Sequence, residues 1–256
     1  MNRELTILLQ AMRSAGAAIE SIRRRNMRVT AKANQSPLTE ADLAANDILK
    51  THLLGHFPHD GWLSEESVDD ISRLDCERVW IVDPIDGTKE FIKNIPEYAI
   101  SAALVVEHKP ILAAVYNPAT EELFYASKNQ GAWLNQERIT CDKSASEPLT
   151  ILASRTEVSE GRWEPIKKNH HIKETGSIAY KLGLVAAGRA QATFSLTPKS
   201  EWDIAAGVLL VTEAGGIASD LAGQAFLFNQ KNALVNGIVA AGSLIHSTVL
   251  RMAMVK

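Results

Sequence analysis

Residues 81–88, Ile81-Val82-Asp83-Pro84-Ile85-Asp86-Gly87-Thr88, run from an apolar strand pattern directly into two carboxylates, a proline, a glycine and a hydroxyl. Because Pro84 restricts the backbone, Asp83 at the end of the strand and Asp86 three positions later can turn toward one point. Two carboxylates that converge need a cation, and Mg²⁺ commonly takes one or two carboxylates alongside substrate phosphate and water. Taken alone, the stretch is equally typical of a surface turn, because turns favour the same residues.

The residues that follow the first aspartate suit a phosphate group. Gly87 allows a phosphate to approach the main chain closely, and residues 88–92 can begin a short helix whose free N–H groups attract an anion. The backbone carbonyl of Ile85 is a further oxygen ligand for a hard cation. The stretch therefore predicts that a metal ion and a phosphate meet at one corner of the fold.

Two other segments carry acidic residues beside apolar ones. Ser64-Glu65-Glu66-Ser67 follows the apolar pair Trp62-Leu63, and Trp202-Asp203 opens an apolar helical run. An aspartate at that place can simply cap its helix, and a pair of glutamates usually lies on the solvated surface. Both segments nevertheless offer carboxylates to the metal site that residues 81–88 predict.

Hydrophobic periodicity predicts a layered arrangement of helices and strands. A helix is expected over about residues 3–24, and a second begins near Ser36-Pro37 or at Thr39, where Thr39-Glu40-Ala41-Asp42 fits a capping box. Strand patterns follow at 79–82, 99–106, 111–116 and 123–126, and the short turn at Lys109-Pro110 indicates that the second and third of them are antiparallel. In the second half, which has an α/β texture, helical stretches lie near 156–168, 177–187, 203–214 and 243–254.

Composition limits the broad class of protein. With 256 residues, 46% of them hydrophobic, the chain can bury a core as one large domain or two halves that share it. A formal charge of −3 provides no general attraction to a nucleic-acid polymer. The first residues lack the apolar run of a signal peptide or membrane anchor, and Cys76 and Cys141 lack disulfide or zinc spacing. We therefore expect a cytoplasmic protein that binds neither nucleic acid nor membrane.

Together, three segments resemble the inositol monophosphatase-like superfamily of lithium-sensitive, Mg²⁺-dependent phosphatases. They are Ser64-Glu65-Glu66-Ser67, residues 82–88 and Trp202-Asp203-Ile204-Ala205-Ala206-Gly207, in the order and at spacings compatible with the family. The resemblance implies an α/β (layered α+β) fold, a sugar-phosphatase-type αβαβα sandwich with a mixed N-terminal sheet and a smaller C-terminal sheet. It also implies a homodimer, with residues 1–145 as the half that carries most metal ligands and residues 146–256 as the half that carries Asp203.

The resemblance implies a specific set of metal ligands. Glu65, Asp83 and the carbonyl of Ile85 would hold one Mg²⁺ ion, and Asp83, Asp86 and Asp203 would hold a second. Asp83 would therefore bridge the two ions. This agrees with the chemistry of the residues, because two cations stabilise both the attacking and the leaving oxygen of a phosphate ester.

Other roles follow from the same resemblance. A third, weaker Mg²⁺ ion near Glu65 would assist through waters, and Asp42 is expected in the outer shell or at this third ion. The catalytic residues would be Asp83, Glu65 and Thr88, since the nucleophile of the family is a metal-activated water beside a threonine and a glutamate. The expected substrate contacts are Ile85, Asp86, Gly87, Thr88, Lys181 and Asp203.

The choice of substrate depends on residues outside the metal motif. Residues 86–92 resemble the bisphosphate nucleotidase branch, which removes the 3′-phosphate of adenosine 3′,5′-bisphosphate to leave AMP. Lys181 matches a nucleotide-binding lysine of that branch, although a solvated lysine on an apolar helix would look the same. Residues 194–201 depart from the pattern of inositol monophosphatases and also from that of bisphosphate nucleotidases. We hypothesise that Lys199, four residues before Asp203, supplies charge for a distal phosphate.

Two kinds of alternative stay open. Inositol monophosphate or fructose 1,6-bisphosphate could be the small phosphorylated substrate, and a non-catalytic regulatory protein could retain the same fold. Other hydrolase classes are disfavoured, because the sequence contains no G-x-S-x-G elbow, P-loop or H-E-x-x-H zinc helix.

Overall fold

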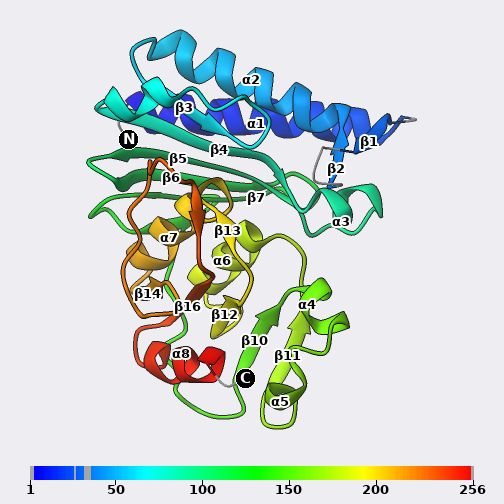
Figure 1. The fold of residues 1–256 in the computed structure, drawn as a ribbon, viewed down its shortest axis with the longest axis vertical. Coiled ribbons are helices and arrows are strands. Elements are labelled where there is room, and N and C mark those ends of the chain that lie inside the picture. Colours follow the sequence, from blue (N-terminus) through cyan, green and yellow to red (C-terminus); the bar gives the residue numbers. More distant parts are fainter. Residues whose placement is uncertain (1–2, 26, 32–35, 255–256) are drawn as a thin grey trace.

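The computed structural model describes residues 3–25, 27–31 and 36–254, and they form five layers. Figure 1 shows α1 (Arg3–Arg23) and α2 (Glu40–His56) over the outer face of a seven-stranded sheet, and α6 (Ile178–Ala186) with α7 (Glu201–Glu213) beneath it. A five-stranded sheet follows, with α8 (His246–Met254) on its far side. The predicted αβαβα sandwich, with a larger N-terminal and a smaller C-terminal sheet, is confirmed.

The larger sheet contains one parallel pair. Its order is β3-β4-β5-β6-β7-β8-β9, and only β3 and β4 run parallel while the other neighbours are antiparallel. Its strands are β3 (Gly61–Ser64), β4 (Arg78–Asp86), β5 (Ala99–Val106), β6 (Lys109–Asn117), β7 (Glu122–Ser127), β8 (Ala132–Leu134) and β9 (Glu137–Ile139). Because parallel strands end at the same edge, the segment after β3 lies beside the end of β4.

The N-terminal helices follow the predicted pattern, and the capping residue decides where the second one begins. The Thr39 side chain accepts hydrogen bonds from the backbone N–H groups of Ala41 and Asp42, and the Asp42 carboxylate accepts one from the Thr39 N–H. This capping box satisfies N–H groups that a helix start leaves unpaired. The expected alternative start near Ser36 is wrong, because β2 (Pro37–Thr39) pairs there with β1 (Val29–Ala31).

The second half is built on a mixed sheet of order β11-β10-β12-β16-β14. Its strands are β10 (Thr150–Ala153), β11 (His171–Glu174), β12 (Ala192–Ser195), β14 (Gly216–Ser219) and β16 (Ile238–Gly242). The short elements around it are η1 (Ile71–Asp75), α3 (Thr88–Ile92), β13 (Lys199–Ser200) and β15 (Leu234–Val235). The single helix expected over 156–168 is wrong: the chain forms α4 (Arg155–Ser159) and α5 (Glu164–Lys167), separated by a turn in which Gly161 has φ 76°.

The two central helices pack closely against each other between the sheets. A Cβ atom at Gly207 of α7 would lie 2.3 Å from a methyl carbon of Leu182 in α6, so only glycine permits this approach. One continuous apolar core joins both helices to the two sheets, including Phe124 of β7 and Ile238 of β16. This packing sets the N-termini of α6 and α7 against the end of β4.

No helix among the described residues is long and apolar enough to cross a membrane.

The boundary between two halves near residue 145 stays a prediction, although each sheet draws its strands from one side of it.

Candidate metal and phosphate site

Three aspartates form what we call the acidic corner: Asp83, Asp86 and Asp203. Each offers a carboxylate oxygen, and these oxygens lie within 4.8 Å of one another. Asp83 and Asp86 are three residues apart on β4, and such residues point to opposite faces of a regular strand. The pairing of β4 with β5 is irregular between them, at Pro84, which has no N–H to donate. This irregularity allows both carboxylates to face Asp203 at the start of α7.

Glu65 joins the acidic corner through the parallel strand pair. It directly follows β3, and its N–H donates to the carbonyl of Val82 on β4 at 3.2 Å. Its carboxylate is close enough to Asp83 to raise the pKa of that aspartate. The structure therefore brings together the four acidic residues from all three predicted segments.

The electrostatics of this cluster fit a bound cation. Burial raises the pKa of Asp83 well above its usual range, and the neighbouring carboxylates raise it further. Burial, together with the charge of Asp86, raises the pKa of Asp203 to about 8. Among the ion pairs within the described residues, none includes an aspartate of the acidic corner. An all-oxygen set of converging carboxylates is the kind of site that holds Mg²⁺.

Thr88 and Asp42 lie next to the corner and contact each other. The Thr88 hydroxyl is 3.1 Å from the carbonyl oxygen of Ile85 and 3.3 Å from Oδ1 of Asp42, so its one hydrogen can go to either. Asp42 is buried, and its other oxygen caps α2 through the Thr39 N–H at 2.8 Å. Asp42 is therefore placed by its helix and reaches the site through Thr88, while its expected role toward a metal stays a prediction.

Gly87 joins the strand to the short helix α3. It has φ 94°, which L side chains rarely adopt, and an added Cβ would lie 3.0 Å from the carbonyl oxygen of Glu97. The short helix expected after this glycine is confirmed as α3. The predicted contact between phosphate and the N–H groups of Gly87 and Thr88 stays a prediction.

Asp86 also connects the acidic corner to α6. One of its oxygens accepts hydrogen bonds from the Ser177 hydroxyl and the Ala179 N–H, both at 2.7 Å. This places Lys181, one turn further along α6, near the same carboxylate. The solvated alternative for Lys181 is wrong, because the side chain is only 4% exposed and its Nζ donates to the Thr175 carbonyl at 3.1 Å. Burial lowers the Lys181 pKa to about 8, and the Asp86 charge opposes that shift.

A pocket lies directly beside Asp86 and Asp203, and four of its other lining residues are cationic. We call the four cations that line it the cationic wall: Lys89, Arg155, Lys181 and Lys199. Ser195 lines the pocket as well, and so does Glu90, whose pKa is raised by burial. Sequence reasoning missed Arg155, because Ser154-Arg155-Thr156 looks like any polar entry to a helix.

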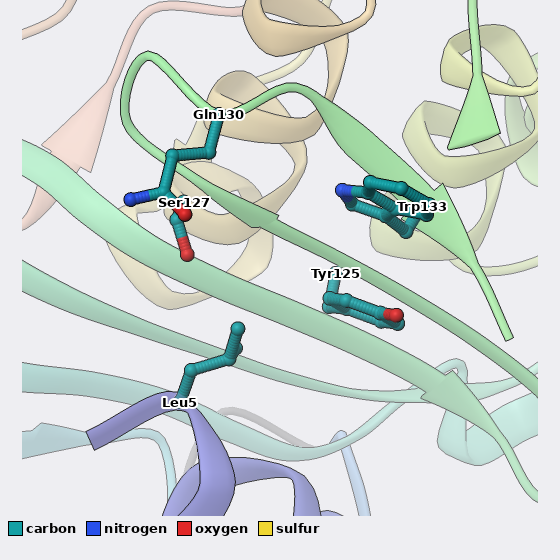
Figure 2. A pocket seen from close by; sticks show the side chains of 5 residues that line it. All are labelled: Leu5, Tyr125, Ser127, Gln130 and Trp133. Carbon is teal, nitrogen blue, oxygen red and sulfur yellow. The ribbon is translucent and has the colours of Figure 1, made fainter. Parts of the chain in front are cut away.

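A second pocket is apolar and lies elsewhere. Figure 2 shows it between the start of α1 and the strands β7 and β8, lined by Leu5, Tyr125, Ser127, Gln130 and Trp133. The rings of Tyr125 and Trp133 are cross-strand partners, nearly parallel with centroids 6.5 Å apart. The described residues that line it offer no carboxylate, imidazole or ammonium group, and β5 and β6 separate β7 from β4. The candidate site is therefore the acidic corner with its charged pocket.

Comparisons with known proteins agree with this geometry. The model of the inositol monophosphatase family matches residues 1–252. The chain is 33% identical over 254 residues to the Nus factor SuhB of Salmonella typhimurium, covering 95% of this chain and 92% of the relative. It is 32% identical over 241 residues to inositol monophosphatase 2 of Solanum lycopersicum, covering 88% of this chain and 90% of that protein.

Solved structures show the same fold. The extragenic suppressor protein SuhB of Bartonella henselae superposes with a TM-score of 0.86 at 30% identity and covers 97% of each chain. CysQ of Bacteroides thetaiotaomicron, described as a bacterial member of the inositol monophosphatase family, has a TM-score of 0.75 at 27% identity, with 93% of this chain and 96% of CysQ covered. The resemblance carried by the three acidic segments is thus confirmed along the whole chain, which belongs to the inositol monophosphatase family of phosphatases.

Proposed function

We propose that the chain is a Mg²⁺-dependent phosphomonoesterase that hydrolyses the 3′-phosphate of adenosine 3′,5′-bisphosphate to AMP and phosphate. The observation that carries this proposal is one pocket that Asp86 and Asp203 of the acidic corner line together with the cationic wall. An acidic corner suits a cation and a phosphate that is cut. A cationic wall beyond it suits a second negative charge on the same substrate.

Residues of the acidic corner and its surroundings would hold the metal. Glu65, Asp83 and the Ile85 carbonyl are proposed for one Mg²⁺ ion, and Asp83, Asp86 and Asp203 for a second. When bound, Mg²⁺ would lower the pKa of the attacking water and neutralise charge on phosphate oxygens. The number of ions, including a third near Glu65, is part of the proposal.

The chain's own residues orient the attacking water and accept its proton. The Thr88 hydroxyl donates its hydrogen to Asp42 or to the Ile85 carbonyl, so its lone pairs are left to accept a hydrogen bond from water. Glu65 lies close enough to Asp83 to act on its charge, and it is proposed to take the proton. Asp42 acts here as a positioning residue for Thr88.

Two lysines support a substrate with a second phosphate. Lys181 is buried beside Asp86, where its charge is retained at neutral pH because its lowered pKa is still about 8. Lys199 reaches the pocket from β13, and its Nζ donates to the Thr197 hydroxyl at 2.9 Å. That hydroxyl in turn donates to the buried carboxylate of Glu157 at 3.1 Å, so the lysine is held in place by a short hydrogen-bonded chain.

The alternatives rest on the names of relatives. Inositol monophosphate is the competing substrate, because a 32% identical relative is an inositol monophosphatase. A non-catalytic regulatory role is the competing class, because relatives at 33% identity are called Nus factors. Against the second alternative, Glu65, Asp83, Asp86, Thr88 and Asp203 are all present and lie together.

A phosphate-release panel tests these possibilities. Adenosine 3′,5′-bisphosphate, inositol 1-phosphate and fructose 1,6-bisphosphate are compared with Mg²⁺, and again with added Li⁺, which we expect to inhibit. The highest kcat/KM is expected for the adenosine bisphosphate. A preference for inositol 1-phosphate would identify inositol monophosphate as the substrate. No release of phosphate from any of the three esters would favour the non-catalytic role.

A further inference from the structure

Arg155 lines the charged pocket and has a donor that is not used. It is the first residue of α4, and its Nη2 donates to Oε2 of Glu97 at 2.6 Å. Its Nη1 lies 3.8 Å from a carboxylate oxygen of Glu174. Its Nε is buried and has no hydrogen-bond partner within the part of the chain that the structure describes. A buried N–H without an acceptor is unfavourable, so Arg155 keeps hydrogen-bonding capacity that Glu97 and Glu174 do not use.

Glu97 holds Arg155 in position from the other half of the molecule. The same Oε2 atom that accepts from Arg155 also accepts from the Gly176 N–H at 2.8 Å. Gly176 and Arg155 both line the pocket, whereas Glu97 precedes β5 of the larger sheet. The carboxylate therefore ties two pocket segments to the sheet that carries Asp83 and Asp86.

The ion pair with Glu97 leaves other N–H donors of the Arg155 guanidinium available. An arginine side chain has five N–H donors in a planar fork that matches phosphate oxygens, and it stays charged at any ordinary pH. A carboxylate that already orients it removes conformational freedom before a ligand binds, which lowers the cost of binding. Lys181 and Lys199 line the same pocket and add positive charge around the bound group.

We propose that Arg155 contacts the phosphate of the substrate that is not cleaved, and that Glu97 is its positioning residue. The inference rests on the proposed function, because it requires a substrate with two phosphates. It makes Arg155 a determinant of specificity for doubly phosphorylated small molecules over singly phosphorylated ones.

The test compares two substrates that share the scissile phosphate. Adenosine 3′,5′-bisphosphate and adenosine 3′-phosphate are hydrolysed with Mg²⁺ by the unmodified protein, Arg155→Ala and Arg155→Lys. Because charged hydrogen bonds are strong, Arg155→Ala should raise KM for the bisphosphate by roughly 10- to 100-fold while kcat changes less than about twofold. Its kinetics on the monophosphate should match those of the unmodified protein, and Arg155→Lys should recover part of the loss.

Two further variants make the test specific. Arg162→Ala is the matched control, because Arg162 is exposed and pairs only with its neighbour Glu160 among the described residues. It should leave both substrates unaffected. Glu97→Gln should raise KM for the bisphosphate alone, and the double variant with Arg155→Ala should be no worse than Arg155→Ala itself, as expected for residues that act as one unit.

The outcomes separate this inference from the function on which it rests. If the unmodified protein prefers the bisphosphate and Arg155→Ala weakens both substrates equally, Arg155 is structural and the inference is overturned. If Arg155→Ala fails to fold, Arg155→Lys decides: a raised KM for the bisphosphate alone supports the inference, and an equal change for both substrates overturns it. If the unmodified protein shows no preference for the second phosphate, both the bisphosphate proposal and this inference fall, and membership of the phosphatase family stands.

Discussion

The acidic corner and the cationic wall meet at one pocket, which Asp86 and Asp203 of the corner line, but they are built in different ways. Each aspartate of the corner accepts a hydrogen bond from a backbone N–H: Asp83 from Ile85, Asp86 from Ala179 and Asp203 from Ser200. In the wall, Arg155 is held by the Glu97 carboxylate, Lys181 by the Thr175 carbonyl and Lys199 by the Thr197 hydroxyl. Backbone contacts tie the corner to the fold itself, whereas the wall can change by substitution alone. The corner is therefore suited to a chemistry shared by relatives, and the wall to a choice of substrate.

Removing one charge from the acidic corner should have the largest effect. Asp83→Asn removes the carboxylate proposed to bridge two ions, and loss of several kcal/mol of charge stabilisation corresponds to roughly a 1000-fold lower kcat. Steady-state phosphate release with saturating Mg²⁺ measures it. Asp75→Asn, at an exposed position, is the control and should keep normal activity. Near-normal turnover by Asp83→Asn would contradict the two-ion proposal.

Removing a charge from the cationic wall should affect KM and leave kcat nearly intact. Lys199→Ala is expected to raise KM for adenosine 3′,5′-bisphosphate about tenfold, because one charged contact to the distal phosphate is lost. Lys168→Ala, at an exposed position outside the pocket, is the matched control. An unchanged kcat/KM for the bisphosphate would show that Lys199 does not bind the distal phosphate.

The corner should also make stability depend on Mg²⁺ and pH together. Burial raises the pKa of Asp83 and Asp203, so between about pH 4 and about pH 8 the metal-free folded protein binds more protons than the unfolded chain. Its stability therefore falls as pH rises through this window. Bound Mg²⁺ replaces those protons, so the gain in melting temperature from Mg²⁺ over chelator should be larger near pH 8 than near pH 5.

Thermal melts of the unmodified protein and of Asp83→Asn measure this linkage. The variant has one carboxylate fewer to ionise, and it should show a smaller Mg²⁺ gain at the higher pH. A gain that is equal at both pH values in the unmodified protein would argue against a metal held by these aspartates.

The smallest effect is expected in the aromatic pocket. Tyr125→Ala removes one face of the pocket in Figure 2 but touches neither the corner nor the wall. Its kcat/KM for every substrate in the panel should stay within about twofold of the unmodified value at a temperature where the variant is folded. A selective loss of kcat/KM for one substrate would show that the aromatic pocket contributes to substrate choice in addition to the corner and the wall.

Local patterns in the sequence were sufficient for the three acidic segments and for most of the helices and strands. The capping box at Thr39, the strand into Asp83 and the glycine at 87 each act through neighbours within a few residues, so their structure follows from their order in the chain. Periodicity was less reliable where tertiary contacts or a turn intervened. Residues 156–168 formed two short helices, and the strand pair β1–β2 displaced the expected early start of α2.

The sequence by itself determined the three acidic segments, and through their resemblance the family and its layered fold, because each segment is a run of residues that are close along the chain. Only the tertiary structure decided what surrounds the phosphate. The partners Glu97 and Arg155 are separated by 58 positions, and Lys181 is buried by the packing of α6 between two sheets. Such contacts depend on which strands pair and how closely helices approach, and no local pattern encodes that.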